Sequence, residues 1–417
     1  MALMPTPFIA RVQTVCPTPL REIESSGWLR SIQDRLDQQR NGRLHRTLRT
    51  PDPRLVDLAS NDYLALRQHP HLLDAVQRAE QYSGAGASRL VTGTSDFHLR
   101  VESRFAQFKG AESALILPTG YQTNLSAITA LPAPGALLLM DRLNHASLFD
   151  AGLLAAAGPA RATLRRYRHC DVDHARTLAR KHLDRHPGAP VWIITDSVFS
   201  MDGDLAPIAQ LAALRDELSS LTPAGAVLFL DEAHATGVLG HTGAGADELF
   251  GHLADLCVST ASKALGSLGG VITGPRLAID AIVNFARPFI YTTAAAPAQV
   301  AAIDAALDLI RDEPERRDRL GALACRLRAA LIEKDWPAQT LGHDPIPIAP
   351  LVVASAAAAL ALSAALEKSG FHAPAIRPPS VPAGACRVRL SLHTDLTDDQ
   401  LDRLIDAIPR YTQAASS

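Results

Sequence analysis

The chain has 417 residues and a formal net charge of −2, with 47% hydrophobic and 20% charged residues. This composition is typical of a soluble globular protein, and a chain of this length can bury a large core in two or three structural units. Because no long basic run is present, the composition gives no case for nucleic-acid binding or for binding to a membrane surface.

The five cysteines are scattered along the chain, and no CxxC pair occurs. This pattern argues against a structural metal site and favours a reducing compartment, so we expect a cytoplasmic protein. The first 16 residues lack a basic stretch followed by an apolar one, so a secretory signal is not predicted. The longest apolar run, residues 349–366, is rich in alanine, and we interpret it as a buried strand at 350–355 followed by a helix rather than as a membrane span.

In chain order, residues 1–25 are aperiodic and contain several prolines, which predicts a poorly ordered extension. Residues 27–40 are predicted to form an amphipathic helix, because Trp28, Ile32 and Leu36 fall on one helical face. The first 54 residues are therefore assigned to an N-terminal extension and helix.

From about residue 55, short apolar runs alternate with helical stretches, which predicts a parallel sheet with both faces covered by helices. We expect one large domain over residues 55–295. Helix-rich sequence at 294–310 and 314–333 then leads into a smaller C-terminal α/β domain, giving a third unit at 296–417. The predicted strands of the large domain are 114–117, 136–140, 191–195, 227–230, 256–259 and 270–273.

Polar residues follow five of these predicted strands. In doubly wound sheets, ligands bind beyond the carboxyl ends of the strands, so the pattern predicts a crevice for a ligand or cofactor. The residues, in strand order, are Thr119, Gly120 and Tyr121; His145; Ser197 and Ser200; Asp231 and His234; and Lys263.

Lys263 is the most informative of these residues. The chain has only five lysines, and this one lies among small and apolar residues, where burial would lower its pKa and free a neutral amine. Asp231 ends another apolar strand and could pair with a cationic ring nitrogen. A Schiff-base lysine and a carboxylate partner are the two protein groups that pyridoxal phosphate (PLP) requires.

Each residue taken singly also has an ordinary structural interpretation, such as a helix cap or a buried histidine, and only the combination is persuasive. The run Asp231-Glu232-Ala233-His234 also spells the DEAH box of helicase-type ATPases, but no Gly-Lys dipeptide for a phosphate-binding loop occurs in the chain. A dinucleotide loop at residues 84–89 lacks the last glycine and does not follow a predicted strand, so that function is disfavoured. A PLP fold without catalysis is disfavoured by the presence of Lys263.

Taken together, the chain resembles the α-oxoamine synthases, a family of PLP-dependent enzymes of fold type I, from about Leu58 to Leu392. The markers are Leu58-Ala59-Ser60-Asn61-Asp62-Tyr63-Leu64, Gly93-Thr94 with His98, Asn144-His145-Ala146-Ser147, Phe199-Ser200-Met201-Asp202-Gly203-Asp204, Asp231-Glu232-Ala233-His234-Ala235-Thr236-Gly237 and Ser262-Lys263. The resemblance implies a large domain with a mostly parallel seven-stranded sheet, a smaller C-terminal α/β domain and a homodimer.

The resemblance also implies roles for individual residues. Lys263 would bind the cofactor covalently and move the substrate α-proton, with Asp231 at the ring nitrogen, His234 at the ring hydroxyl and His145 on the ring face. The remaining implied contacts are Gly120, Tyr121 and Thr260 with the phosphate, Ser200 with the ring oxygen and Arg389 with the amino acid carboxylate, and Arg46 and Ser380 match positions associated with substrate. Arg377, which lies between Ile376 and two prolines, is a candidate to bind a distal carboxylate of an acyl substrate, with Arg46 as the second candidate.

Within the family, residues 375–382 resemble the members that condense L-alanine with a pimeloyl thioester, on coenzyme A or a carrier protein, in biotin biosynthesis. Members that use glycine with an acetyl group, or that transfer a palmitoyl group to serine, remain the alternatives. Two departures from the family pattern, at Asp196-Ser197 and at Arg142, are not expected to touch the chemistry.

Overall fold

The computed structural model describes residues 27–42, 45, 47–48, 50–79, 83–378, 380–382 and 384–411. The chain divides into two units, Met1–Pro51 and Asp52–Ser417. The predicted extension at residues 1–25 lies outside the described residues. In the first unit, the predicted helix is confirmed as α1 (Gly27–Asn41).

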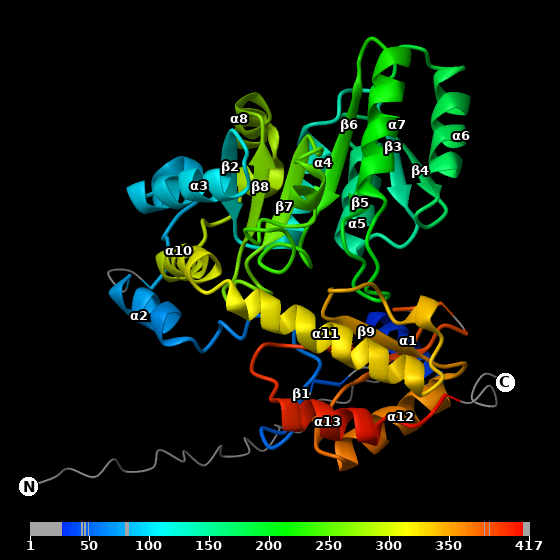
Figure 1. Cartoon of the computed structure of the whole chain (residues 1–417). Coiled ribbons are helices and arrows are strands. Elements are labelled where there is room, and N and C mark those ends of the chain that lie inside the picture. Colours follow the sequence, from blue (N-terminus) through cyan, green and yellow to red (C-terminus); the bar gives the residue numbers. More distant parts are fainter. Residues whose placement is uncertain are drawn as a thin grey trace, which may run out of the picture. The chain divides into compact units, whose positions relative to one another are not determined.

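The second unit is built around a seven-stranded sheet with the strand order β2-β8-β7-β6-β5-β3-β4 (Figure 1). Five neighbouring strands, from β7 to β4, pair in parallel, and β8 runs antiparallel to both of its neighbours. The expected mostly parallel seven-stranded sheet is therefore confirmed. The strands are β2 (Ser113–Leu117), β3 (Leu137–Asp141), β4 (Thr163–Tyr167), β5 (Val191–Asp196), β6 (Ala226–Asp231), β7 (Leu256–Thr260) and β8 (Gly270–Gly274).

The apolar runs have a simple cause, since helices cover both faces of the sheet. On β5, Val191 and Ile193 pack in one apolar core, whereas Trp192 and Ile194 pack in the other. Because successive side chains of a strand point to opposite faces, a strand covered on both faces must be apolar throughout.

The two helical layers come from different parts of the chain (Figure 1). Helices α4, α5 and α8 contribute to one core, and α3, α6, α7 and α10 contribute to the other. The helices around the sheet are α2 (Pro70–Arg78), α3 (Asp96–Phe108), α4 (Gly120–Ala130), α5 (Ala146–Ala157), α6 (Val172–Leu183), α7 (Ile208–Leu221), α8 (Arg276–Phe285), α9 (Arg287–Ile290) and α10 (Pro297–Asp312), with a short π-helix (Arg89–Gly93) and a 3-10 turn (Asp247–Phe250).

The C-terminal part carries a smaller antiparallel sheet with the strand order β11-β12-β9, and a two-stranded parallel sheet pairs β1 with β10. The predicted strand and helix within residues 349–366 are confirmed here, and none of the described helices is long and apolar enough to cross a membrane. The division of the chain near residue 295 stays a prediction. These elements are β1 (Val56–Asp57), α11 (Glu315–Glu333), a 3-10 turn (Ala338–Thr340), β9 (Ile348–Val352), α12 (Ala356–Lys368), β10 (Phe371–His372), β11 (Ala375–Ile376), β12 (Arg387–Ser391) and α13 (Asp398–Ala407).

All six predicted strands of the large domain are present, within one or two residues of the expected bounds. The sequence missed β4, which reads Thr-Leu-Arg-Arg-Tyr and forms an edge of the sheet. Arg165 and Arg166 on this strand are exposed, so the continuous apolar run that marks a central strand is lacking.

Candidate active site

The predicted site residues lie where the strands of the large sheet end. Helix α4 begins at Gly120 directly after β2, and its first amide N–H groups have no partner within the helix. A Cβ atom at Gly120 would lie 3.2 Å from Thr260 Oγ1, at the end of β7. Gly120 thus allows the start of α4 to approach Thr260 closely, which forms a backbone cradle suited to a phosphate.

Lys263 follows β7 in the turn that continues from Thr260. Within the described residues, its ammonium group makes no hydrogen bond or ion pair. Burial, opposed in part by the charges of Asp231 and Asp196, lowers the pKa of Lys263 to about 8. The neutral amine that a Schiff base requires is therefore accessible near neutral pH.

A relay of hydrogen bonds connects Asp231 to His145. Asn124, on the first turns of α4, donates to Asp231 Oδ2 at 2.6 Å and to Ser147 Oγ at 2.9 Å, and Ser147 Oγ lies 2.8 Å from His145 Nδ1. Asp231 Oδ1 accepts the backbone N–H of Ala233 at 2.9 Å. The carboxylate of Asp231 is thereby fixed in direction, as a partner for a ring nitrogen must be.

Asp196 corrects the expectation that this departure from the family pattern is remote from the chemistry. Asp196 is aligned with Asp231 on the neighbouring strand, is buried, and accepts the backbone N–H of His145 at 2.7 Å. Burial and the nearby charge of Asp231 raise the pKa of Asp196 well above its usual range. The residue therefore holds the His145 backbone and contributes to the electrostatics around Lys263.

His234 is held by a residue that the sequence did not single out. The Tyr63 hydroxyl lies 2.7 Å from His234 Nδ1, and both side chains are buried. Burial, followed by the charges of Lys263 and Arg389, holds the pKa of His234 well below its usual value. The imidazole is therefore neutral and has a single N–H group to donate.

Two buried arginines on β12 have different surroundings. Arg387 forms an ion pair with Asp202 at 2.6 Å. Arg389 donates to the Ser200 carbonyl at 3.0 Å, to Ser391 Oγ at 2.7 Å and to the Asn61 side-chain oxygen, but it has no carboxylate partner within the described residues. A buried guanidinium without a counter-charge is a site for an anionic ligand group, such as the carboxylate of an amino acid.

The contacts of the other predicted site residues do not test the roles assigned to them. Tyr121 is 44% exposed, and its hydroxyl donates to Asp150. Ser200 meets Arg389 through its carbonyl, and Ser380 is exposed in a turn where its N–H donates to the Arg377 carbonyl at 3.1 Å. Arg46 lies outside the described residues. The roles assigned to these residues stay predictions.

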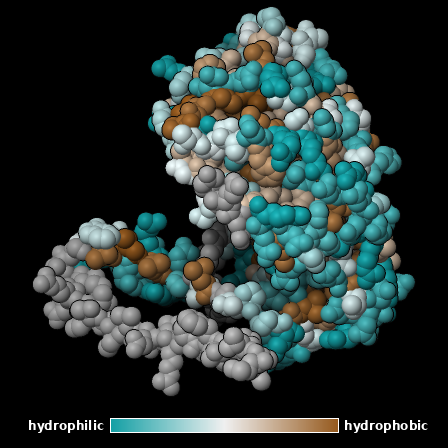
Figure 2. Space-filling model, turned by 90° about the vertical axis from the view of Figure 1, so that its left-hand side faces the viewer, coloured by the Kyte–Doolittle hydropathy of each residue, from teal (hydrophilic) through white to brown (hydrophobic). Residues whose placement is uncertain are grey.

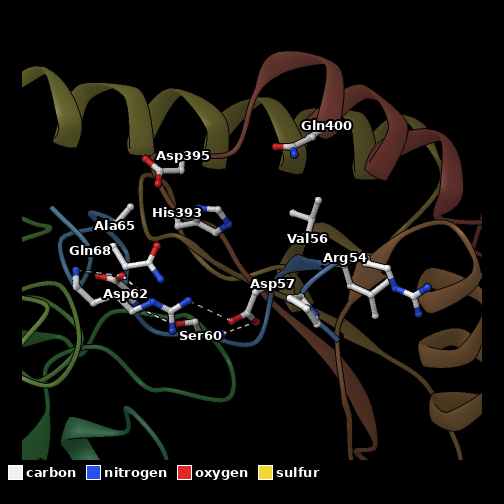
Figure 3. Close-up of a pocket in the computed structure, with 13 residues that line it drawn as sticks. Arg54, Val56, Asp57, Ser60, Asp62, Ala65, Gln68, His393, Asp395 and Gln400 are labelled. Carbon is white, nitrogen blue, oxygen red and sulfur yellow. Dashed lines mark hydrogen bonds and ion pairs between the residues drawn. The ribbon is translucent and has the colours of Figure 1, made fainter. Parts of the chain in front are cut away.

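A separate polar pocket of about 350 Å³ adjoins the segment that carries Ser60, Asp62 and Ala65 (Figure 3). Asp62 and His393 line it, and the described residues that line it include none of the predicted site residues. One group of potential metal ligands, Asp141, His169 and Cys170, gathers elsewhere. Both ring nitrogens of His169 are already hydrogen-bonded, to Asp141 and Asp204, which leaves neither of them for an ion.

The residues present fit PLP. Besides the cradle at Gly120 and the amine of Lys263, the Asn124 side-chain oxygen is buried beside the fixed carboxylate of Asp231 and has no hydrogen-bond partner in the described part of the chain. The fold and this set of side chains define a PLP-dependent enzyme.

The comparisons with known proteins give the family. Residues 53–408 match the family model of aminotransferase class I and II, and the chain belongs to this family. It is 44% identical to 8-amino-7-oxononanoate synthase of Stutzerimonas stutzeri over 85% of this chain and 87% of that protein.

Solved structures of similar fold support the same family assignment. The chain resembles serine palmitoyltransferase of S. paucimobilis with a bound PLP–myriocin adduct (TM-score 0.79, 25% identity, 90% of this chain and 95% of that chain). It also resembles 8-amino-7-oxononanoate synthase of Francisella tularensis (TM-score 0.69, 27% identity, 85% and 97%). The resemblance to α-oxoamine synthases is confirmed.

The pKa of Lys263 predicts the pH dependence of cofactor loading. The rate at which the cofactor-free protein develops visible absorbance with PLP should rise with pH with a midpoint near 8, because only the neutral amine reacts. In Asp231→Asn the midpoint should move to lower pH, because the charge of Asp231 raises this pKa. Stopped-flow absorbance measures both, and a wild-type midpoint near 10.5, the ordinary lysine value, would contradict the desolvated site.

Proposed function

We propose that the protein condenses L-alanine with a pimeloyl thioester, carried on coenzyme A or a carrier protein, to give 8-amino-7-oxononanoate for biotin biosynthesis. The alanine α-carbon forms a bond to the acyl carbonyl carbon, the thiol leaves, and the alanine carboxyl group leaves as carbon dioxide. The 44% identity to a synthase of that name over most of both chains supports this assignment.

The observation that carries the proposal is the pair formed by Lys263 and Arg389. One is an unpaired amine of lowered pKa and the other a buried guanidinium with no carboxylate partner within the described residues, and an α-amino acid requires both a proton-transfer group and a carboxylate anchor. The charge of Arg389 is among the influences that lower the pKa of Lys263, so the two groups are close enough to interact electrostatically.

The bound cofactor would supply an electron sink for the negative charge that develops on the α-carbon. Lys263 would hold the cofactor and then remove the α-proton, and Asp231 would keep the ring nitrogen protonated. His145 would cover the ring face, His234 would donate to the ring oxygen, and Arg389 would orient the carboxylate.

A second candidate is a synthase that uses serine and a fatty-acyl thioester. It is favoured by the structural comparison, in which serine palmitoyltransferases score higher than the Francisella enzyme (TM-scores of 0.79 and 0.69). Sequence identity favours the first candidate, at 44% against 25%. The ATPase alternative is disfavoured, because the chain has no Gly-Lys dipeptide for the phosphate-binding loop that such an enzyme requires.

We also propose a cytoplasmic homodimer. Exposed apolar side chains stand on α8 and shortly after it, with Leu277, Phe285 and Tyr291 exposed by 81%, 68% and 71%, and Figure 2 shows apolar side chains gathering in a band on one face. Such patches mark protein interfaces. The four described cysteines are free, in keeping with a reducing compartment. Sedimentation equilibrium should give twice the chain mass, and a monomer at micromolar concentration would contradict the dimer.

Substitution of Asp231 by asparagine should retain cofactor binding and suppress proton transfer. The variant keeps the shape of the side chain but removes the charge that stabilises a protonated ring. Loss of a partner for a buried charge costs on the order of 3–5 kcal/mol, so exchange of the L-alanine α-proton with D2O should slow by roughly two to three and a half orders of magnitude. Proton NMR follows the exchange, and near-normal exchange in a folded, cofactor-loaded variant would exclude this role.

Acyl specificity tests the proposed reaction itself. A pimeloyl chain ends in a free carboxylate, and Arg377, in the Pro-rich turn with Ser380, is the candidate to bind it. Arg377→Met should raise KM for the pimeloyl thioester by roughly ten- to a hundredfold, the effect of a charge-assisted hydrogen bond of ~1.5–3 kcal/mol, and leave L-alanine binding little changed.

The control for this experiment is an uncharged acyl thioester of equal length, with products identified by mass. Wild type should prefer the carboxylate-bearing chain, and Arg377→Met should lose most of that preference. If wild type shows no preference, the second candidate, a fatty-acyl synthase, replaces the first.

A further inference from the structure

A series of close polar contacts joins the candidate carboxylate anchor, Arg389, to the candidate ring-oxygen partner, His234. The Asn61 side-chain oxygen accepts from Arg389 and lies 3.3 Å from the Tyr63 hydroxyl, which in turn lies 2.7 Å from His234 Nδ1. Tyr63 and His234 come from segments 171 residues apart, so this contact is a product of the fold.

The turn that carries Asn61 and Tyr63 is fixed from two sides. Backbone hydrogen bonds join it to β12 and the residues that follow, from Ser391 N to the Leu58 carbonyl at 2.8 Å and from Thr394 N to the Tyr63 carbonyl at 3.0 Å. On the side of the polar pocket, the Asp62 carboxylate accepts the N–H of Leu66 at 2.9 Å. The Tyr63 hydroxyl is therefore held in place rather than free to adjust.

The distances favour one arrangement of the protons in these contacts. Burial raises the pKa of Tyr63, so its hydroxyl keeps its one proton. The hydroxyl can donate to only one of its two neighbours, and His234 Nδ1, at 2.7 Å, lies closer than the Asn61 oxygen, at 3.3 Å. Tyr63 therefore donates to Nδ1, and the single proton of the neutral imidazole resides on Nε2.

We propose that Tyr63 is a positioning residue that fixes the tautomer and orientation of His234, so that the Nε2–H group is presented to the ring oxygen of the cofactor. This inference rests on the proposed function, which assigns His234 to that oxygen. A hydrogen bond accepted at Nδ1 strengthens donation at Nε2 through the polarisable ring. Donation to the ring oxygen stabilises its anionic form and thereby lowers the pKa of the neighbouring cofactor–lysine linkage.

The test is a pH titration of the visible absorbance of the cofactor-loaded Tyr63→Phe variant. Without the phenol hydroxyl, Nδ1 loses its donor and the Nε2–H bond weakens, so the pKa of the cofactor–lysine linkage should rise by roughly half to one pH unit. Tyr167→Phe is the matched control, because Tyr167 is also fully buried, on β4, and is not among the residues that contact Tyr63 or His234 in this series. Its titration should coincide with that of wild type.

A second variant covers the case in which Tyr63→Phe does not fold. Replacement of Tyr63 by 3-fluorotyrosine keeps the ring and hydroxyl but makes the phenol a stronger donor, so the same pKa should fall below the wild-type value. A pKa unchanged from wild type in either variant overturns the proposal for Tyr63, although the proposed function would stand. Absence of the visible band in loaded wild-type protein would instead overturn the proposed function.

Discussion

The site depends on one desolvated lysine, Lys263, which makes no hydrogen bond or ion pair in the part of the chain that the structure describes. The same unit contains a buried counter-example, Lys109, which is bonded to Glu232 and to a backbone carbonyl. Burial acts to lower the pKa of both lysines, but the charge of Glu232 overcomes it at Lys109, whose pKa is raised, whereas that of Lys263 falls. Lys109 is thus a structural cation, and Lys263 is an available amine. The two pKa values differ because of the charged partner of Lys109, and not because one lysine is more buried than the other.

The rest of the site supports the ligand that Lys263 would hold. Asn124 and Ala233 fix the direction of the Asp231 carboxylate, and Asp196 fixes the His145 backbone. These groups are pre-oriented by protein hydrogen bonds, so that little reorganisation is needed when charge develops on a bound substrate. The pairing of Arg387 with Asp202 leaves Arg389 as the cation of β12 that has no carboxylate partner within the described residues.

Much of this could be predicted from the sequence, because buried parallel strands are continuously apolar and the residues after them share one edge of the sheet. Edge strand β4 could not be predicted from the sequence, since its arginines face solvent and interrupt the apolar run. Tyr63 belongs to a marker segment of the family, but its role depends on a contact with His234 across the fold. Asn124 follows Gly120 by one helical turn, and this spacing places both residues on the same side of α4. The spacing could therefore have identified Asn124 as a residue of the site. Asp196 was misjudged because the alignment of β5 with β6, which brings it beside Asp231, is a property of the sheet.

The most direct test of the central claim is to locate the covalent attachment. Wild-type protein loaded with PLP and reduced with borohydride should yield, after proteolysis and mass spectrometry, one modified peptide carrying the reduced cofactor on Lys263. The other lysines, including the paired Lys109, should be unmodified. Attachment at another lysine, or stoichiometric retention of reducible cofactor in Lys263→Ala, would contradict the account.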